Sequence, residues 1–206
     1  MATRKYDQVL RAEAARKTRR RILDAVGQRL REVPTEQPSL DQVARLAKVS
    51  RSTIYADFGS RAGLFDAFVV DLWERTGLRE LNAAVAAPDA RRHLREGIAA
   101  ASRMKGQDLA TYRVLHAMDR LDPESAGGAV RLMEKDRRAG MESLAAHLER
   151  DGALREDVSA EEATDALWVL TSFESLDLLM TGRGLTVDEA IETLVAMAER
   201  AVCRPA

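Results

Sequence analysis

The chain has little of what stabilises disulfide-rich, membrane-spanning or sheet-based proteins. Its 206 residues include one cysteine, Cys203, so no disulfide can form within the chain and a reducing cytoplasm is expected. No run of 18 consecutive apolar residues is present, which argues against a transmembrane helix. The basic N-terminus lacks the apolar segment of a signal peptide. Five prolines, few aromatic residues and no long alternating β-branched run favour helices over sheets.

Patterns that support catalysis are also missing. The three histidines, His93, His116 and His147, are scattered and lack the close spacing of metal ligands. No nucleophile elbow, P-loop or dinucleotide-binding glycine pattern occurs, and Gly182-Arg183-Gly184 follows no expected strand. We therefore expect no catalytic residue, no metal site, no cofactor and no enzymatic activity. The alternative from another class is a helical enzyme or small-molecule-binding protein whose basic end serves another partner.

Charge is abundant, and it is divided unevenly along the chain. Residues 1–61 carry 14 Lys and Arg against 7 Asp and Glu, whereas residues 62–206 carry 18 against 26. This division predicts a basic N-terminal part that meets an anionic partner and an acidic remainder. The alternative is a chance distribution of solvated charges.

Two short helices joined by a tight turn are expected within the basic part. Ser39 and Gln42 form a capping box for the first helix, which has an apolar face of Leu40, Val43, Ala44 and Ala47. Ser50 can cap a second helix over residues 51–58, with Ile54 directed inward. So short a helix needs neighbours to hold it. A polar, Arg-containing start on a packed second helix is typical of a helix-turn-helix that enters a DNA major groove.

The same stretch resembles the DNA-binding region of tetracycline-repressor (TetR) type regulators. The matching pattern, V-A-x-x-A-x-V-S-x-x-T-x-Y-x-x-F-x-S-R-x-x-L-F, runs from Val43 to Phe65. The resemblance is close over residues 18–70, and beyond them only length and helical character agree. It implies an all-α fold: a three-helix helix-turn-helix DNA-binding domain with a basic extension over residues 1–65, then a helical ligand-binding and dimerisation domain over residues 66–206.

Candidate DNA contacts follow from this resemblance and from side-chain chemistry. The resemblance implies phosphate contacts for Ser39, Tyr55 and Arg61. Arginine can pair with guanine and hydroxyl groups with any base, so the candidates for base edges are Arg51, Ser52 and Thr53. The alternative for Thr53 and Tyr55 is a structural role in the turn.

Two positions depart from the family pattern. Lys48 stands where relatives often carry Gly; if the turn needs a positive φ, Lys is less favourable there than Gly, and Lys48 can add a phosphate contact instead. Asp57 stands where relatives often carry a basic or aromatic residue. A carboxylate near phosphates is unfavourable unless it faces a cytosine amine or an Arg, so the bases that are contacted stay open.

The first helix is expected over residues 18–32, and nothing from Tyr6 onward prevents it from starting earlier. Arg19 and Arg20 lie near its start, where cations oppose the helix dipole, so we interpret them as phosphate contacts. Residues 1–17 are either a basic arm that touches DNA or a disordered tail.

The rest of the chain is expected to be helical. Predicted helices cover residues 61–77, 89–104, 107–120, 124–150, 160–181 and 186–202. The last two carry apolar stripes, and in the resembled family the final two helices form a four-helix bundle with a second subunit. This implies a dimer interface of Leu167, Leu170, Leu176, Ile191, Leu194, Val195 and Ala198. The alternative is that both stripes pack inside one subunit.

Relatives also bind small inducers among their middle helices. Candidates for such a pocket are Trp73, Met104, Tyr112, His116, Met133, Trp168, Phe173 and Glu174. Of these, Tyr112, His116 and Glu174 can be polar anchors. The alternative for each is an ordinary place in the core.

The sequence thus predicts a cytoplasmic transcriptional regulator that acts as a homodimer on a palindromic double-stranded DNA operator and has no membrane partner. We expect a repressor that an unidentified small-molecule effector releases. An activator, or a regulator without a ligand, is the alternative within this class.

Overall fold

The computed structural model describes residues 2–33, 37–121 and 128–205. Within these ranges every regular element is helical, and a single antiparallel bridge joins Leu154 to Cys203. The fold is therefore all-α, as the sequence predicts. Over the described part of the chain, no helix has both the length and the hydropathy needed to cross a bilayer.

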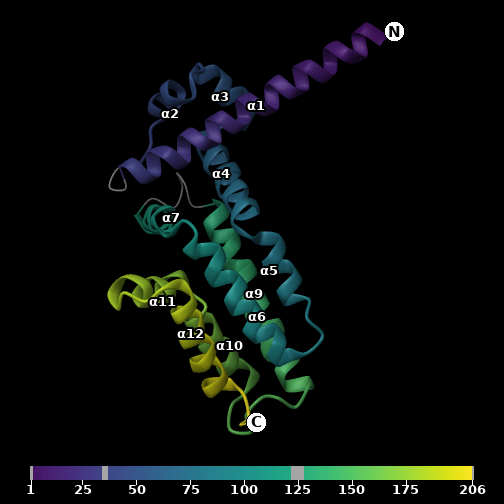
Figure 1. The fold of residues 1–206 in the computed structure, drawn as a ribbon, viewed down its shortest axis with the longest axis vertical. Helices are drawn as coiled ribbons and strands as arrows, with labels where there is room; N and C mark the ends of the chain where they lie inside the picture. The colour runs from purple at the N-terminus through teal and green to yellow at the C-terminus, as the bar shows by residue number, and fades with distance from the viewer. Residues whose placement is uncertain (1, 34–36, 122–127, 206) are drawn as a thin grey trace. The chain divides into compact units, whose positions relative to one another are not determined.

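The helices follow one another with short connections (Figure 1). They are α1 (Ala2–Glu32), α2 (Leu40–Ala47), α3 (Arg51–Phe58), α4 (Arg61–Thr76), α5 (Leu78–Val85), α6 (Ala90–Gly106), α7 (Leu109–Leu121), α9 (Gly128–Arg150), α10 (Ala160–Leu170), α11 (Phe173–Asp177), the π-helical turn η1 (Leu178–Gly182) and α12 (Val187–Val202). The chain forms two compact units, Met1–Asp71 with Arg113–Val130 and Leu72–Tyr112 with Arg131–Ala206. The first unit thus extends beyond residue 65, where the sequence suggests a boundary.

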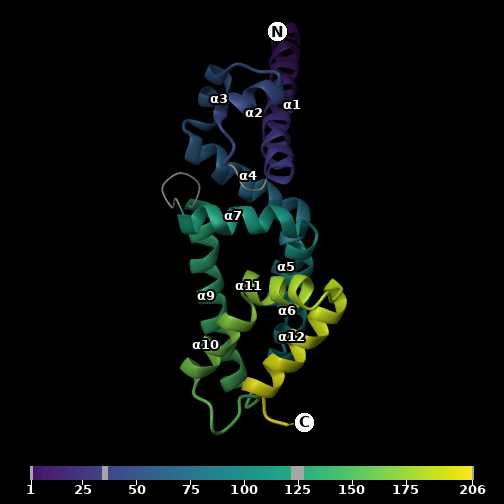
Figure 2. The same ribbon diagram turned by 90° about the vertical axis from the view of Figure 1, so that its left-hand side faces the viewer.

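The first unit is organised around one face of α1. The described side chains at its centre are fully or nearly fully buried: Ile22, Val26, Leu30, Val43, Ala47, Ile54, Leu64, Phe65 and Phe68. They come from α1, α2, α3 and the beginning of α4, and both ribbon views place α2 and α3 beside α1 (Figures 1 and 2). The expected three-helix core is present, and α1 starts well before residue 18, as the lack of helix breakers suggested.

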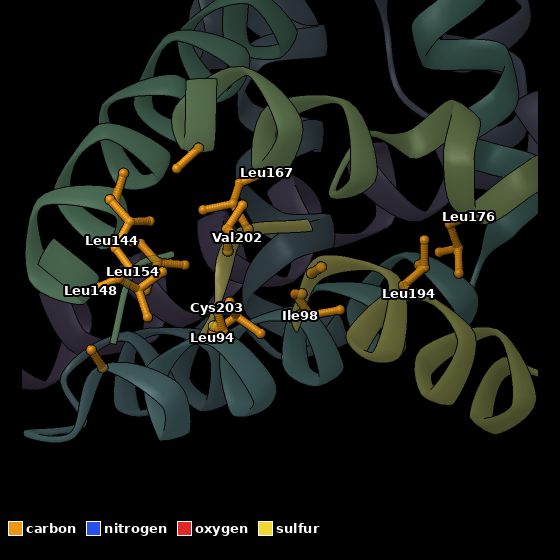
Figure 3. Close-up of a cluster of buried hydrophobic side chains, with 14 of the residues drawn as sticks. Leu94, Ile98, Leu144, Leu148, Leu154, Leu167, Leu176, Leu194, Val202 and Cys203 are labelled. Carbon is orange, nitrogen blue, oxygen red and sulfur yellow. The ribbon is translucent and has the colours of Figure 1, made fainter. Parts of the chain in front are cut away.

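The second unit has its own apolar core between α6, α9, α10 and α12. Figure 3 shows Leu94 and Ile98 of α6 in one cluster with side chains from the other three helices. The end of α12 is fastened by backbone bonds on either side of the Leu154–Cys203 bridge. Arg155 N donates to Val202 O at 3.0 Å, and Arg204 N donates to Ala153 O at 2.9 Å.

Two features of the predicted helices differ from the structure. The short helix α5 occupies residues that the predicted helices left unassigned. The helix expected over residues 160–181 breaks after Leu170, because the Ser172 hydroxyl accepts from Ser175 N at 3.1 Å and caps a new helix. The start of the helix expected from residue 124 lies outside the described ranges, and within them α9 runs from Gly128 to Arg150.

Most side chains predicted for a subunit interface are buried within the chain itself. Those that are fully or nearly fully covered are Leu167, Leu176, Ile191, Leu194 and Ala198. Leu170 and Val195 are partly buried against the same core. The apolar stripes of the last two helices therefore face α6 and α9 rather than solvent. Their burial favours the alternative in which both stripes pack inside one subunit, since periodicity indicates burial without saying what covers it.

Candidate nucleic-acid interface

Helix α2 has the capping that its sequence predicts. Gln42 N donates to Ser39 Oγ at 3.2 Å, and Ser39 N donates to Gln42 Oε1 at 2.8 Å. These two bonds satisfy backbone and side-chain groups at the start of the helix, so its first residue is well defined. Ser39 itself is exposed, which leaves room for a partner beside the cap.

The turn between α2 and α3 requires a positive φ at Lys48. Its φ and ψ are 53° and 49°, and its amide donates to Arg45 O at 3.2 Å. Among the described residues other than glycine, Lys48 alone has a positive φ. Its side chain is exposed, so the residue combines an unfavourable backbone conformation with a free surface position.

We predict that Lys48→Gly stabilises the protein by about 1 kcal/mol, because glycine adopts this conformation without a Cβ penalty. Lys48→Ala is the matched control, since it removes the charge and keeps the penalty. If Lys48 contacts phosphate, both variants should lower the slope of log affinity against log salt by about one. Thermal unfolding and DNA titrations at several salt concentrations measure the two effects. A glycine variant no more stable than the alanine variant would contradict this account of the turn.

Helix α3 begins with a cluster of hydroxyl groups. The Ser50 hydroxyl accepts from Thr53 N at 3.2 Å and lies 2.7 Å from Ser52 Oγ and 2.9 Å from Thr53 Oγ1. Thr53 is half-buried, whereas Ser52 is exposed. Ile54 is fully buried and fixes the helix to the core. The start of α3 therefore offers polar groups on a helix that is held from behind.

Arg51 and Tyr55 lie on the exposed side of α3. The Arg51 guanidinium is 3.5 Å from an Asp41 carboxylate oxygen. The Tyr55 side chain and the Asp41 charge both raise the pKa of Arg51, so it remains a cation at all relevant pH values. Both side chains are exposed, and the ion pair is weak enough for a phosphate or a base edge to replace it.

The other arginines that the sequence assigned to DNA contacts are engaged within the first unit. Arg19 Nη1 donates to Asp57 O at 3.1 Å and its guanidinium lies 4.3 Å from the centre of the Phe58 ring. Arg20 Nη1 lies 3.1 Å from Asp71 Oδ1. Arg19 thereby stabilises the C-terminal end of α3, where a cation is favourable.

Arg61, at the start of α4, is half-buried and linked to the segment before α2. Its Nη2 donates to Gln37 Oε1 at 3.0 Å and to Pro38 O at 3.4 Å, and its guanidinium lies 5.0 Å from the centre of the Phe65 ring. These bonds give Arg61 a structural role that sequence reasoning missed. The role expected from the family pattern, a phosphate contact, stays a prediction.

Gly63 is a second position that sequence reasoning missed. A Cβ at this residue would overlap the carbonyl oxygen of Phe58, at the end of α3. Gly63 N also donates to Ser60 Oγ at 2.9 Å, so Ser60 caps α4. The signal in the sequence is a glycine in the first turn of a helix, where better helix formers are available.

The residues predicted for a ligand pocket are divided between the two units. Trp73, Met104, Tyr112, Met133, Trp168, Phe173 and Glu174 belong to the second unit, and His116 belongs to the first. Tyr112 and Phe173 are stacked, with ring centroids 6.2 Å apart. Burial raises the pKa of Tyr112 to about 12, so its phenol stays neutral. Met104 lines a surface cleft of about 510 Å³ that also includes Thr76, Gly77 and Gln107.

A larger cleft of about 770 Å³ lies beside the end of α12. It is lined by the arginines Arg91, Arg95, Arg155, Arg200 and Arg204, by the carboxylates Glu156, Asp157 and Glu199, and by Cys203. Arg95 is 2.6 Å from Glu199, and Arg155 is 2.6 Å from Asp157. Much of the charge in this cleft is thus already paired. Nowhere in residues 2–33, 37–121 and 128–205 do three potential metal-ligating His, Cys, Asp or Glu side chains come together.

A capped helix-turn-helix with a polar exposed helix on a buried support defines the chain as a DNA-binding protein of the helix-turn-helix class. Residues 22–68 match the family model of bacterial regulatory proteins of the tetR family. The match spans the helix-turn-helix and the helices that hold it, so this N-terminal domain is similar to that of TetR-family transcription regulators. No match was found among curated proteins.

Solved structures of TetR-type regulators have the same fold along nearly their whole length. NalD, the secondary repressor of the MexAB-OprM multidrug efflux pump in Pseudomonas aeruginosa, is 24% identical and superposes with a TM-score of 0.71, covering 93% of this chain and all of its own. A TetR-family regulator from Marinobacter aquaeolei VT8 is 16% identical, with a TM-score of 0.69 over 94% of this chain and all of its own. AibR, solved with isovaleryl coenzyme A and operator DNA, is 15% identical, with a TM-score of 0.65 over 87% of this chain and 97% of its own. At these identities the likeness establishes the fold.

Proposed function

We propose that the chain is a sequence-specific repressor that binds a palindromic operator as a homodimer and is released by a small ligand. The observation that carries this proposal is the start of α3, where exposed polar side chains sit on a helix anchored by the buried Ile54. Two similar structures support the finer claims: NalD is described as a repressor, and AibR was solved with both DNA and an acyl-coenzyme A. Operator DNA in bacteria lies in the cytoplasm, so we propose that compartment.

The candidate DNA contacts take different roles in this proposal. Arg51 and Ser52 are exposed at the start of α3 and are assigned to base edges. Thr53, half-buried and bonded to Ser50, mainly fixes the start of the helix. The exposed residues Ser39, Lys48 and Tyr55 are assigned to phosphates. Arg19, Arg20 and Arg61 position the helices, and their remaining N–H groups can meet the DNA backbone.

Paired substitutions test the assignment of Arg51 and Arg61. Arg51→Ala is expected to weaken discrimination at one base position by about 1–3 kcal/mol, because a bidentate contact to a base is lost. Arg61→Ala is expected to weaken binding to all duplexes and to lower the salt slope. Titration of specific and scrambled duplexes measures both. Arg79→Ala, a highly exposed arginine on α5, is the control. If neither Arg51→Ala nor Arg61→Ala changes DNA affinity, the proposal that the helix-turn-helix binds DNA is wrong.

We place the homodimer contact on the outer sides of α10, η1 and α12. After the core is formed, Val169 remains 59% exposed, Leu178 69% and Met197 41%. Exposed apolar side chains of this size on neighbouring elements are typical of a protein contact surface. A two-fold dimer suits two half-sites about 34–36 Å apart, so a second copy of this chain is the partner we propose.

The ligand would act by favouring a conformation that does not fit the operator. It must bind that conformation more tightly than the DNA-bound one, since a ligand with equal affinity for both shifts nothing. We propose that it binds in the second unit, near the stacked rings of Tyr112 and Phe173. The other predicted residues of this unit, Trp73, Met104, Met133, Trp168 and Glu174, are proposed as lining. His116 belongs to the other unit and is not part of this proposal.

A further inference from the structure

Two cations of the second unit contact the same residue. Lys105 of α6 is only 4% exposed, and its Nζ donates to Thr171 O at 2.8 Å. Arg137 of α9 donates from Nη1 to Thr171 Oγ1 at 3.0 Å and to Trp168 O at 2.5 Å. Because both side chains bond to Thr171, an ammonium and a guanidinium lie close together at the point where α10 ends.

Nearby acidic side chains compensate the positive charge of Arg137 more directly than that of Lys105. Glu134 binds Arg137 directly, with Nε 3.1 Å from Oε2. Among the described residues, no carboxylate lies within ion-pair distance of Lys105, and Glu174 is exposed to water. Burial, and after it repulsion by Arg137, lowers the pKa of Lys105 to about 8, while Glu134 and Glu174 act in the opposite direction. Lys105 is therefore mostly charged at pH 7, in a place where an unpaired charge is unfavourable.

Helix capping accounts for part of this arrangement. The carbonyls of Trp168 and Thr171 lie at the C-terminal end of α10, where one cation is favourable. Arg137 already occupies that position and is only partly buried. An ammonium has three donors, and one bond to a carbonyl uses one of them. A fully buried second cation therefore exceeds what capping needs, and its remaining donors suit a bound anion.

Apolar side chains also lie beside the cation pair. Met141 Sδ is 3.6 Å from Thr171 Oγ1, and the Trp168 ring centre lies 5.2 Å from the Arg137 guanidinium. Phe173, two residues after Thr171, is stacked on Tyr112. A ligand that reaches Lys105 must thus offer apolar surface as well as charge.

We propose that Lys105 and Arg137 bind the carboxylate of a small apolar acid, and that such an acid is the effector. The inference rests on the ligand-released function proposed above and names the chemical class of its ligand. Glu134 is bonded to Arg137, whereas Lys105 has no carboxylate at ion-pair distance among the described residues, so a single carboxylate suits Lys105. A phosphate dianion would leave an excess negative charge in the same buried place.

Binding to the intact protein without DNA tests this proposal. The probes are hexanoate, decanoate and phenylacetate, each beside its primary amide, with inorganic phosphate as a further arm. Calorimetric titration and the shift in Tm are the readouts. At least one acid is expected to bind ten or more times more tightly than its amide. Lys105→Met is expected to remove that preference, and Lys135→Met, an exposed lysine of α9, to keep it. If no acid binds, if amides bind equally well, or if phosphate alone binds, the proposal is overturned.

A pH series separates ligand binding from a purely structural role. Affinity for the acid is expected to fall as pH rises from 7 to 9.5 in the wild type, because Lys105 loses its proton, and to stay flat in Lys105→Met. The charged groups that act on Lys105 are Arg137 and Glu134 of α9 and Glu174 of α11. A wild-type affinity that is independent of pH would contradict the proposal that Lys105 binds the carboxylate of the ligand.

The two proposals can fail separately. DNA affinity is measured on the same variants in the absence of any acid. If an acid binds through Lys105 but leaves the operator complex intact, the proposed carboxylate site is confirmed and the proposed release by ligand is wrong. If the protein binds its operator but no acid binds, the proposed carboxylate site is wrong and the proposed DNA-binding function is supported.

Discussion

Replacing Gly63 by alanine is expected to disrupt the junction between α3 and α4 and to abolish specific DNA binding. The added Cβ would overlap the carbonyl oxygen of Phe58, which is backbone and cannot rotate away. That carbonyl also accepts from Ser60 N at 2.8 Å, so its movement would disturb the cap of α4. A loss of about 1–3 kcal/mol in the free energy of unfolding is expected from such overpacking.

Gly140→Ala is the matched control for this substitution. Gly140 lies inside α9, and no atom lies within 4 Å of a Cβ built there. Alanine at this position should stabilise the protein by about 0.5–1 kcal/mol, as in an ordinary helix interior. Thermal unfolding and DNA titration of both variants make the comparison. A Gly63→Ala protein that is as stable as Gly140→Ala and binds DNA normally would show that the close approach of α4 to Phe58 is unimportant.

The double variant Val169→Glu, Met197→Glu is expected to be monomeric and to lose about 100-fold or more in operator affinity. Two carboxylates on the proposed contact surface would have to be buried without partners. A monomer also loses the gain from binding two half-sites at once, which is typically about 10²–10⁴-fold. Sedimentation velocity measures the oligomeric state, and titration with one and two half-sites measures the affinity.

Leu132→Glu is the control for the dimer surface. Leu132 is 56% exposed on α9, outside the proposed contact. Its replacement is expected to leave both the dimer and operator affinity unchanged. If the double variant remains dimeric, the dimer contact does not lie on α10, η1 and α12. If the wild-type protein is monomeric, the proposal of a homodimer is wrong.

The helix-turn-helix could be located from the sequence because its signals are local. Ser39 with Gln42, and Ser50 with Thr53, form hydrogen bonds over three residues, so the sequence nearly fixes where α2 and α3 begin. The positive φ at Lys48 is also a local feature, because Lys48 is the residue at which α2 ends and the turn begins. The family pattern could therefore be compared with the chain position by position.

Features that depend on distant residues could not be predicted in this way. The two stripes that include Leu167 and Leu194 indicate burial, but which helices cover them depends on the fold of the second unit. The break after Leu170 depends on hydroxyl bonds that compete with the helix. Lys105 has the residue type of a surface position, and only the structure shows it buried beside Arg137. The need for glycine at position 63 likewise cannot be predicted from the sequence, because it depends on the close approach of the Phe58 carbonyl.

The most direct test of the central claim is selection of bound sequences from a random duplex pool at about 0.15 M salt, since affinities for DNA depend strongly on salt. We predict recovery of one palindrome whose half-sites are about ten base pairs apart, or a multiple of that spacing. Such a site would identify a dimeric regulator that binds specific DNA through α3. Recovery of no common sequence, with binding that only weakens as salt is raised, would contradict the account of α3 as a sequence-reading helix.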